Sequence, residues 1–143
     1  MRDETVVRAI FRIFGNEGEP LPDVTALLGI EPDTHTRIGD LIVGGGRAAP
    51  RETWSIENFE RVADDDCAEG AERCLDRVLE RLERVDAADK LRRSGLLAMA
   101  EIKVSGFCFD LRNSNIWHPP ARLRRVADLG VPLGEDFYLR TDE

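Results

Sequence analysis

The chain has 143 residues, of which 42% are hydrophobic and 34% are charged, and its formal net charge is −8. This length is enough for one domain with a sizeable core, and the composition excludes a disordered chain. A negative chain repels phosphate backbones, so we expect no nucleic-acid partner. The sequence therefore predicts a single globular domain over residues 1–143.

The cysteines and the N-terminal segment bear on the compartment. The N-terminal residues lack the apolar run of a signal peptide, and no stretch approaches the roughly 20 apolar residues of a membrane span. The three cysteines, Cys67, Cys74 and Cys108, form no Cys-x-x-Cys motif. We expect them to be reduced thiols, with Cys74 and Cys108 in the core. We therefore expect the protein to be cytoplasmic and to have no membrane partner.

The first half of the chain predicts three strands and one short helix. Apolar residues alternate between residues 6 and 14, which indicates a strand with one buried face; they are Val7, Ala9, Phe11 and Ile13. A turn at 15–22 leads to a helix at 23–28. Further strands are expected at 36–43 and 51–57. The glycines between them suit a flexible connection better than a phosphate-binding loop, which joins a strand to a helix.

The strongest helix pattern lies between residues 71 and 85. Its apolar residues recur at spacings of four and three, which places them on one face; they are Ala71, Leu75, Val78, Leu82 and Val85. We expect the central three to be buried against the sheet, with Arg77 and Arg84 exposed. The acidic run Asp64-Asp65-Asp66 lies near the helix start, where negative charge is stabilising. Capping therefore explains this run better than a metal site.

The last part of the chain predicts a strand, a helix and a final strand. The strand covers residues 97–111, and Gly106 marks either a bulge or a strand end that is covered on both sides. A polar loop at 112–118 precedes a helix that begins at Pro119-Pro120. A last strand is expected at 135–140. The helix has an apolar side formed by Leu123, Val126, Ala127 and Leu129.

Two segments far apart in the chain end with the same stop signal. The first helix ends Leu28-Gly29-Ile30-Glu31-Pro32, and the last ends Leu129-Gly130-Val131-Pro132. Gly adopts the left-handed cap and Pro cannot continue the helix. The recurrence of this helix ending predicts pseudo-repeated strand–helix–strand units. We expect an α+β fold with two layers, in which a mostly antiparallel sheet carries helices on one face. The element order is ferredoxin-like (βαββαβ), extended by a further αβ unit.

Five motifs in order resemble a known family. They are Phe11-Arg12-Ile13-Phe14-Gly15, Leu28-Gly29-Ile30-Glu31-Pro32, Arg37-Ile38-Gly39-Asp40, Trp54 and Leu129-Gly130-Val131. The chain is similar over nearly its whole length to uncharacterised, mainly bacterial domains called domain of unknown function 4279. The resemblance implies a bacterial, single-domain α+β protein and carries over no catalytic residues.

Recognisable catalytic and metal-binding patterns are missing from the sequence. The two histidines, His35 and His118, have no further ligand at a metal-binding spacing. We expect His35 to be a turn residue. A pairing of Cys108 with His118 is disfavoured, because an apolar strand raises the pKa of a thiol. We therefore expect no catalytic residues, no metal and no cofactor.

Two surfaces are candidates for binding. One is the sheet face of Arg8, Arg12, Tyr138 and Arg140, and its alternative interpretation is a solvated face with scattered ion pairs. The other is the loop of Asn113, Asn115, Trp117 and His118, where Trp117 alternatively covers the edge of the core.

The sequence favours a non-catalytic module that binds another macromolecule. One version is an acidic, immunity-type antagonist whose acids between residues 57 and 69 attract a basic protein. The oligomeric state and the partner's identity do not follow from the sequence. The alternative is a small-molecule-binding protein or minor enzyme, with a pocket between sheet and helices near Trp54 and Trp117.

Overall fold

A computed structural model describes residues 4–42 and 44–140. The strands are β1 (Glu4–Phe14), β2 (Thr34–Thr36), β3 (Thr53–Ala63), β4 (Ala100–Cys108) and β5 (Leu133–Leu139). The helices are α1 (Val24–Leu28), α2 (Cys67–Arg84), α3 (Ala87–Ser94) and α4 (Pro120–Leu129). Short 3-10 turns are η1 (Asp64–Asp66), η2 (Leu97–Met99) and η3 (Leu111–Ser114).

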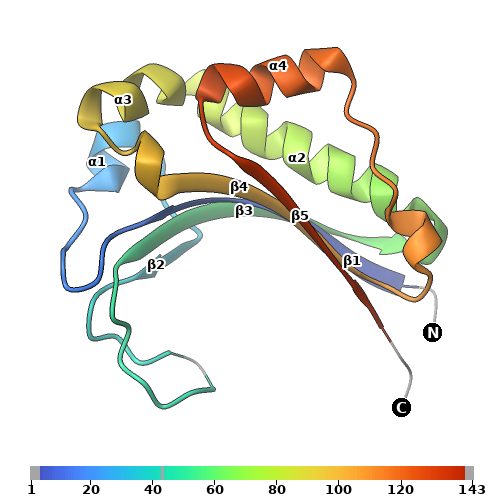
Figure 1. Cartoon of the computed structure of the whole chain (residues 1–143), viewed down its shortest axis with the longest axis horizontal. Coiled ribbons are helices and arrows are strands. Elements are labelled where there is room, and N and C mark those ends of the chain that lie inside the picture. The colour runs from blue at the N-terminus through green and yellow to red at the C-terminus, as the bar shows by residue number, and fades with distance from the viewer. Residues whose placement is uncertain (1–3, 43, 141–143) are drawn as a thin grey trace.

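The strands form one five-stranded sheet in the order β2-β3-β1-β4-β5. The central strand β1 is antiparallel to β3 and β4, β2 is antiparallel to β3, and β5 is parallel to β4. All four helices lie on one side of the sheet, which arches beneath them (Figure 1). The predicted α+β class, with helices packed on one face of the sheet, is confirmed.

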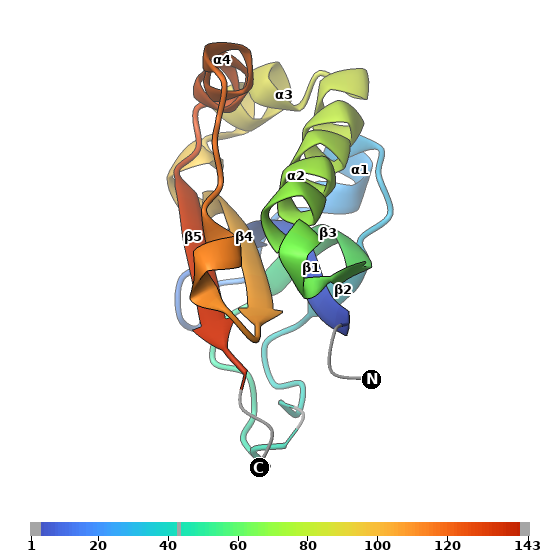
Figure 2. The same ribbon diagram turned by 90° about the vertical axis from the view of Figure 1, so that its right-hand side faces the viewer.

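The core lies between the sheet and α2. The alternating residues of β1 are fully buried, as are Leu75, Val78 and Leu82 of α2, whereas Arg77 and Arg84 are exposed. This part of the helix prediction is confirmed. Figure 2 shows α2 over β1 and β3, with α4 above the β4 and β5 side. A Cβ atom on Gly70 would lie 2.8 Å from Val62, so this glycine lets α2 approach the sheet closely.

Helix α4 is less apolar on its inner side than predicted. It begins at Pro120 as expected, and Val126 and Leu129 are buried. Leu123 and Ala127 are exposed, so the four-residue apolar side is wrong in half of its members. The reason is that α4 meets α2 through charged side chains, as described below.

Several predicted boundaries differ from the structure in the segment between residues 34 and 63. The strand expected at 36–43 is wrong, because β2 ends at Thr36 and a turn follows. In that turn the Asp40 carboxylate accepts a hydrogen bond from the Arg37 N–H at 2.7 Å, and Gly39 has φ 92°. The strand expected at 51–57 continues to Ala63. The glycines of the connection lie between β2 and β3, as predicted.

Two sequence features have other structural roles than those predicted. The β1–β4 register is unbroken up to its last pair at Gly106, and the β4–β5 register runs through that residue, so there is no bulge. A Cβ atom there would lie 2.9 Å from the Phe137 ring, so the glycine makes room for that side chain. The Asp66 side chain forms no cap hydrogen bond at the start of α2. Instead, the Asp64 carboxylate binds the segment after β4.

The two stop signals are confirmed, and the units that contain them differ in one respect. Gly29 and Gly130 both adopt the left-handed conformation, with φ of 72° and 81°. In the β4–α4–β5 unit the two strands are parallel neighbours. In the β1–α1–β2 unit the strands are also parallel, but β3 lies between them.

Candidate functional site

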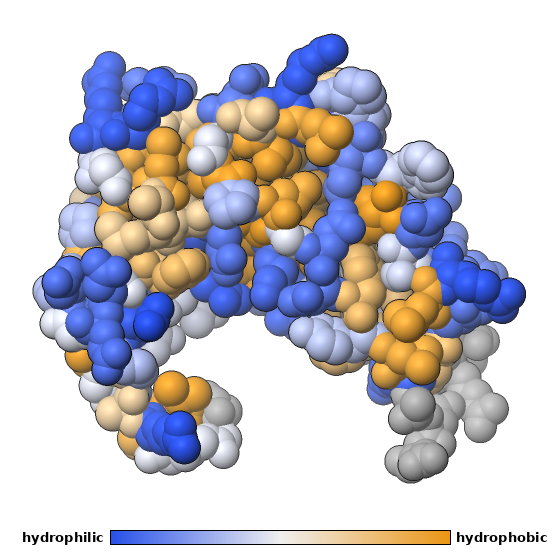
Figure 3. Space-filling model, viewed as in Figure 1, coloured by the Kyte–Doolittle hydropathy of each residue, from blue (hydrophilic) through white to orange (hydrophobic). Residues whose placement is uncertain are grey.

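The sheet face opposite the helices is concave, and none of the residues that the structure describes forms a layer over it. In the space-filling view the molecule is hollowed underneath, between the β2–β3 connection and the far end of β5 (Figure 3). We call this surface the open face. The cross-strand register shows which side chains share it; among them are Arg8, Ile10, Arg12, Ser55, Glu57, Phe59, Glu101, Lys103, Ser105, Phe107, Asp136 and Tyr138.

Charges of both signs are paired across the open face. Arg8 lies 3.7 Å from Glu57, and Arg12 lies 3.8 Å from Glu101. Lys103 lies 2.9 Å from Asp136, whose hydrogen bond raises the pKa of the ammonium group. Exposed pairs of this kind contribute little to stability. They leave the centre of the face close to neutral, although the whole chain is strongly acidic.

Three aromatic side chains project from the open face. Phe59, Phe107 and Tyr138 are 58%, 47% and 50% exposed. Phe107 and Tyr138 stack on each other, with ring centroids 5.3 Å apart and planes 24° apart. Large apolar side chains that remain exposed on a sheet face are typical of a surface that another molecule covers. These three aromatic side chains are therefore the most exposed large apolar groups of the open face.

A hollow of about 360 Å³ lies at the other end of the open face, beneath the β2–β3 connection. Three arginines, Arg8, Arg12 and Arg51, line it together with one carboxylate, Glu57. The rest of the lining consists of four hydroxyl residues and four apolar residues; they are Thr34, Thr36, Thr53, Ser55, Ile10, Ile42, Ala49 and Pro50. The excess of arginine makes this hollow suitable for a small anion.

A second hollow, of about 650 Å³, lies beside β2 on the helix side and contains a His–Glu pair. His35 Nε2 is 2.6 Å from the Glu52 carboxylate, and the Leu21 N–H donates to the other carboxylate oxygen at 2.8 Å. His35 is therefore a strand residue paired with a buried acid, and the prediction of a simple turn residue is wrong. Both Glu52 oxygens are occupied, so the pair holds the segment around Leu21 against the end of β2.

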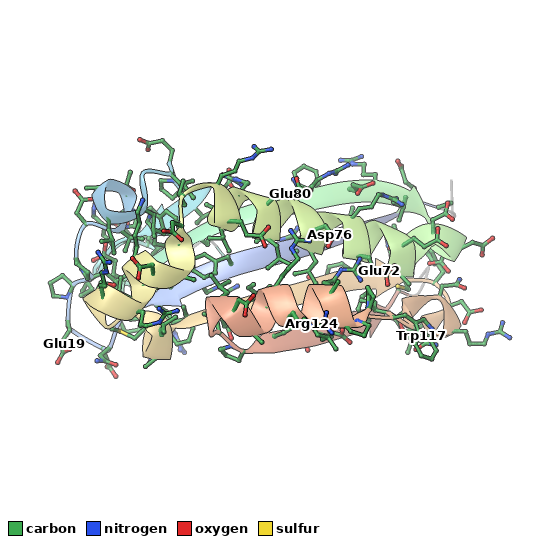
Figure 4. All side chains as sticks on the ribbon, turned by 90° about the horizontal axis from the view of Figure 1, so that it is seen from above. Glu19, Glu72, Asp76, Glu80, Trp117 and Arg124 are labelled. Atoms are coloured by element: carbon green, nitrogen blue, oxygen red, sulfur yellow. The ribbon has the colours of Figure 1, made fainter. Side chains whose placement is uncertain are left out.

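The loop before α4 lies away from the open face. Figure 4, which looks onto the helix layer, places Trp117 beside the start of α4, and this side chain is 76% exposed. Asn113 donates to Asp64 at 2.8 Å, and His118 lies 2.5 Å from Glu135. Asn115 is exposed. Two of the four candidate residues of this loop therefore hold it in place, and Trp117 does not cover the core.

Helices α2 and α4 are joined by a row of ion pairs. Figure 4 places Asp76 and Glu72 between the two helices. Arg122 donates to both oxygens of Asp76, at 2.9 and 3.0 Å, and Arg125 donates to Asp76 and Glu83. The hydrogen bonds from Arg122 lower the pKa of Asp76. These pairs take the place of an apolar contact along this side of α4.

Acid is expected to weaken the attachment of α4 through Asp76. The folded-state pKa of Asp76 lies below its unfolded value of about 3.9, so its stabilising contribution is complete above that pH. The contribution is lost as the pH falls through the lowered pKa. Between pH 7 and 3, Asp76→Asn should unfold at a lower temperature than the wild type, and this difference in unfolding temperature should narrow below about pH 4. Asp65→Asn is the control, because Asp65 is exposed and forms no ion pair in residues 4–42 and 44–140. A difference in unfolding temperature that stays constant with pH would show that the Asp76 carboxylate does not stabilise the attachment of α4 through its charge.

The structure brings together only part of the residue set chosen from the sequence. Arg8, Arg12 and Tyr138 share the open face, but Arg140 lies past the end of β5, with its guanidinium 5.4 Å from the Phe109 ring centroid. Sequence reasoning missed Phe59 and Phe107. Continuing the alternation of the strand at 51–57 by two residues would have reached Phe59.

The predicted pocket shared by Trp54 and Trp117 does not match the positions of these residues. Trp54 is fully buried on the helix side of β3, where its indole N–H donates to Thr25 at 3.0 Å, whereas Trp117 is exposed at the start of α4. In the helix layer there is instead a hollow of about 260 Å³, which is lined by residues of α2, α3 and α4, among them Leu79, Leu82 and Leu129.

The described residues contain no group of three or more His, Cys, Asp or Glu side chains arranged to hold a metal ion. Within residues 4–42 and 44–140, no helix combines the length and apolar character needed to cross a membrane. The three cysteines are free and buried. The expected core positions of Cys74 and Cys108 are confirmed.

Comparisons with known proteins place the chain in a family. A search of curated proteins and a search of solved structures each found no match. A family model does match, over residues 4–140, and its description is domain of unknown function. Because this match covers nearly the whole chain, the protein belongs to the family called domain of unknown function 4279 (DUF4279).

Proposed function

We propose that this is a cytoplasmic bacterial protein without catalytic activity, which binds another protein through the open face. The first six elements are proposed to be a ferredoxin-like unit, supported by the antiparallel neighbours β2-β3-β1-β4. A reducing compartment suits the three free, buried thiols.

One observation carries the binding proposal: three aromatic side chains remain exposed on a concave face that none of the helices α1 to α4 covers. Aromatic residues and arginine are the types that most often anchor interfaces, because they bury a large area and still form polar contacts. Phe59 lies opposite Arg8 across the β1–β3 ladder, while the stacked pair Phe107–Tyr138 lies on the other side of β1. This arrangement has apolar anchors with charged groups beside them.

The partner that fits is a protein segment with apolar side chains flanked by charges of both signs. Such a segment would exchange the cross-strand pairs of Arg8 and Arg12 for pairs with its own acids and bases. The open face itself is close to neutral, so any attraction of a basic partner comes from acids elsewhere. For an immunity-type antagonist, charge reversal at the exposed Glu69 should slow association.

The test compares two surfaces of the same protein. Proteins captured from a native lysate by the wild-type chain are identified, and their affinity is then measured for Phe107→Ala/Tyr138→Ala and for Trp117→Ala. Loss of the stacked pair is expected to weaken binding by about 30-fold or more, as for interface anchors. Trp117→Ala is the matched control, since it removes an exposed aromatic residue remote from the open face. A partner that binds the double variant as tightly as the wild type would overturn the proposal.

A second candidate function is supported by the arginine-lined hollow. In this alternative a small anionic molecule, such as a dicarboxylate or phosphate compound, binds between Arg8, Arg12 and Arg51. Calorimetric titration with inorganic phosphate and with succinate tests it. Arg12→Ala and Arg51→Ala should each weaken binding roughly tenfold, whereas Arg124→Ala on α4 should not change it. If neither anion binds the wild-type chain, this candidate fails and the protein-binding proposal is unaffected.

A further inference from the structure

Two of the buried thiols face each other across the fold. Cys67 is the first residue of α2 and Cys108 is the last residue of β4, and they are 41 positions apart in the chain. Their Sγ atoms are 2.6 Å apart, and neither residue is exposed to solvent. The third thiol is not part of this pair. Cys74 Sγ has the Val7 carbonyl oxygen at 3.8 Å and a Glu60 carboxylate oxygen at 3.9 Å as its polar neighbours.

A carboxylate holds the two thiol-bearing segments together. Asp64, three residues before Cys67, accepts hydrogen bonds from the N–H groups of Phe109 and Asp110 at 2.7 and 3.2 Å. The Asn113 side chain donates to the same carboxylate at 2.8 Å. Phe109 directly follows Cys108, so these hydrogen bonds to Asp64 align the two cysteines independently of any contact between the thiols. The pair therefore has a geometry set by the surrounding backbone.

We propose that Cys67 and Cys108 form a reversible disulfide when the protein meets a low-molecular-weight disulfide oxidant of the glutathione type. The thiolate of one cysteine attacks the oxidant, which forms a mixed disulfide and releases one thiol. The second cysteine then attacks the mixed disulfide, forms the Cys67–Cys108 bond and releases the second thiol. In total two protein thiols are oxidised, one small disulfide is reduced to two thiols, and their two protons pass to the released thiols.

Burial controls when this reaction takes place. Desolvation raises the pKa of both Cys67 and Cys108, so few thiolates exist in the closed fold at neutral pH. Oxidation therefore requires local opening of the segments that the Asp64 hydrogen bonds hold together. Asp64 is a positioning residue for the cysteine pair. The resulting bond would tie the start of α2 to the end of β4 and restrict the adjoining loop of residues 111–118. Transient disulfides of this kind are the form expected in a reducing compartment.

The experiment uses the full chain, reduced and then incubated with oxidised glutathione at pH 8. After denaturation in acid, remaining thiols are alkylated and the peptides are mapped by mass spectrometry. We expect a linked Cys67–Cys108 peptide, the loss of two hydrogen atoms from the intact mass, and alkylation at Cys74 alone. The oxidised protein should unfold roughly 5–15 °C higher than the reduced protein, because the bond closes a long loop, and dithiothreitol should reverse the shift.

Variants separate this pair from general thiol oxidation. Cys108→Ala should abolish both the linked peptide and the reversible shift, whereas Cys74→Ala should keep both. Asp64→Asn should speed oxidation severalfold, since it weakens the hydrogen bonds that hold the two thiol-bearing segments together. The proposal is overturned if all three thiols of the wild-type chain remain alkylatable after prolonged oxidation in mild denaturant, or if Cys74 is the cysteine that becomes linked. These readouts do not involve a binding partner, so they are independent of the proposed function.

Discussion

Replacing Leu82 with Ala is expected to lower the free energy of unfolding by about 2–5 kcal/mol. Leu82 is only 1% exposed and lies on the side of α2 that faces the core. Its truncation removes apolar contacts and leaves a cavity that the surrounding helices and strands fill only in part. The measurement is urea unfolding followed by circular dichroism, with the slope checked for two-state behaviour.

The control for this prediction is Leu123→Ala on α4. Leu123 is the same residue type but is 48% exposed, so its truncation should change the stability by less than about 0.5 kcal/mol. A loss below about 1 kcal/mol for Leu82→Ala would mean that this part of the core collapses around the missing side chain. Equal losses for the two variants would contradict the assignment of α2 as the principal core helix.

Glu52→Ala is expected to destabilise the protein by about 2–3 kcal/mol, although it removes no apolar group. Glu52 is 8% exposed, and its two oxygens are bound to the Leu21 N–H and to His35. Alanine leaves the half-buried Leu21 N–H and His35 ring without this acceptor, and the loss of two hydrogen bonds to a carboxylate costs about this much. Thermal and chemical unfolding of the purified variant give the value.

Glu52→Gln separates the loss of charge from the loss of the acceptor. The amide oxygen can still accept from the Leu21 N–H, so the Gln variant should lose clearly less stability than the Ala variant. If the Ala variant is as stable as the wild type, the Glu52 carboxylate has no structural role. The hollow beside β2 would then be a candidate for a chemical role of the His35–Glu52 pair.

The charges on the open face do not fit the expectation that an acidic chain attracts a basic partner there. The net charge of −8 describes the whole chain, but on this face Arg8, Arg12 and Lys103 each pair with a carboxylate. A simple attraction between an acidic surface and a basic protein therefore does not account for binding at this face. Contact through aromatic residues, with exchange of paired charges, fits the side chains that are present.

Elements whose signals are local could be predicted from the amino-acid sequence. The period-two pattern of β1, the capping residues Gly29 and Gly130, and the start of α4 at Pro120 depend on backbone conformation and on burial along one segment. The burial of Leu75, Val78 and Leu82 followed from helical spacing in the same way. The family resemblance, carried by short motifs in order, was also present in the chain and is shown by the match over residues 4–140.

Contacts between residues far apart in the chain could be assigned only from the folded structure. The strand expected at 36–43 failed because side-chain and glycine turn geometry outweighed its β-branched residues. The pairs His35–Glu52, Arg122–Asp76 and Cys67–Cys108 join residues 17, 46 and 41 positions apart, and no periodicity along the chain encodes such distances. The sheet register also decided that Phe107 and Tyr138 stack on the open face while Arg140 lies past its edge. Candidate contact residues can be found from the sequence, but their grouping into one surface depends on the order of the strands.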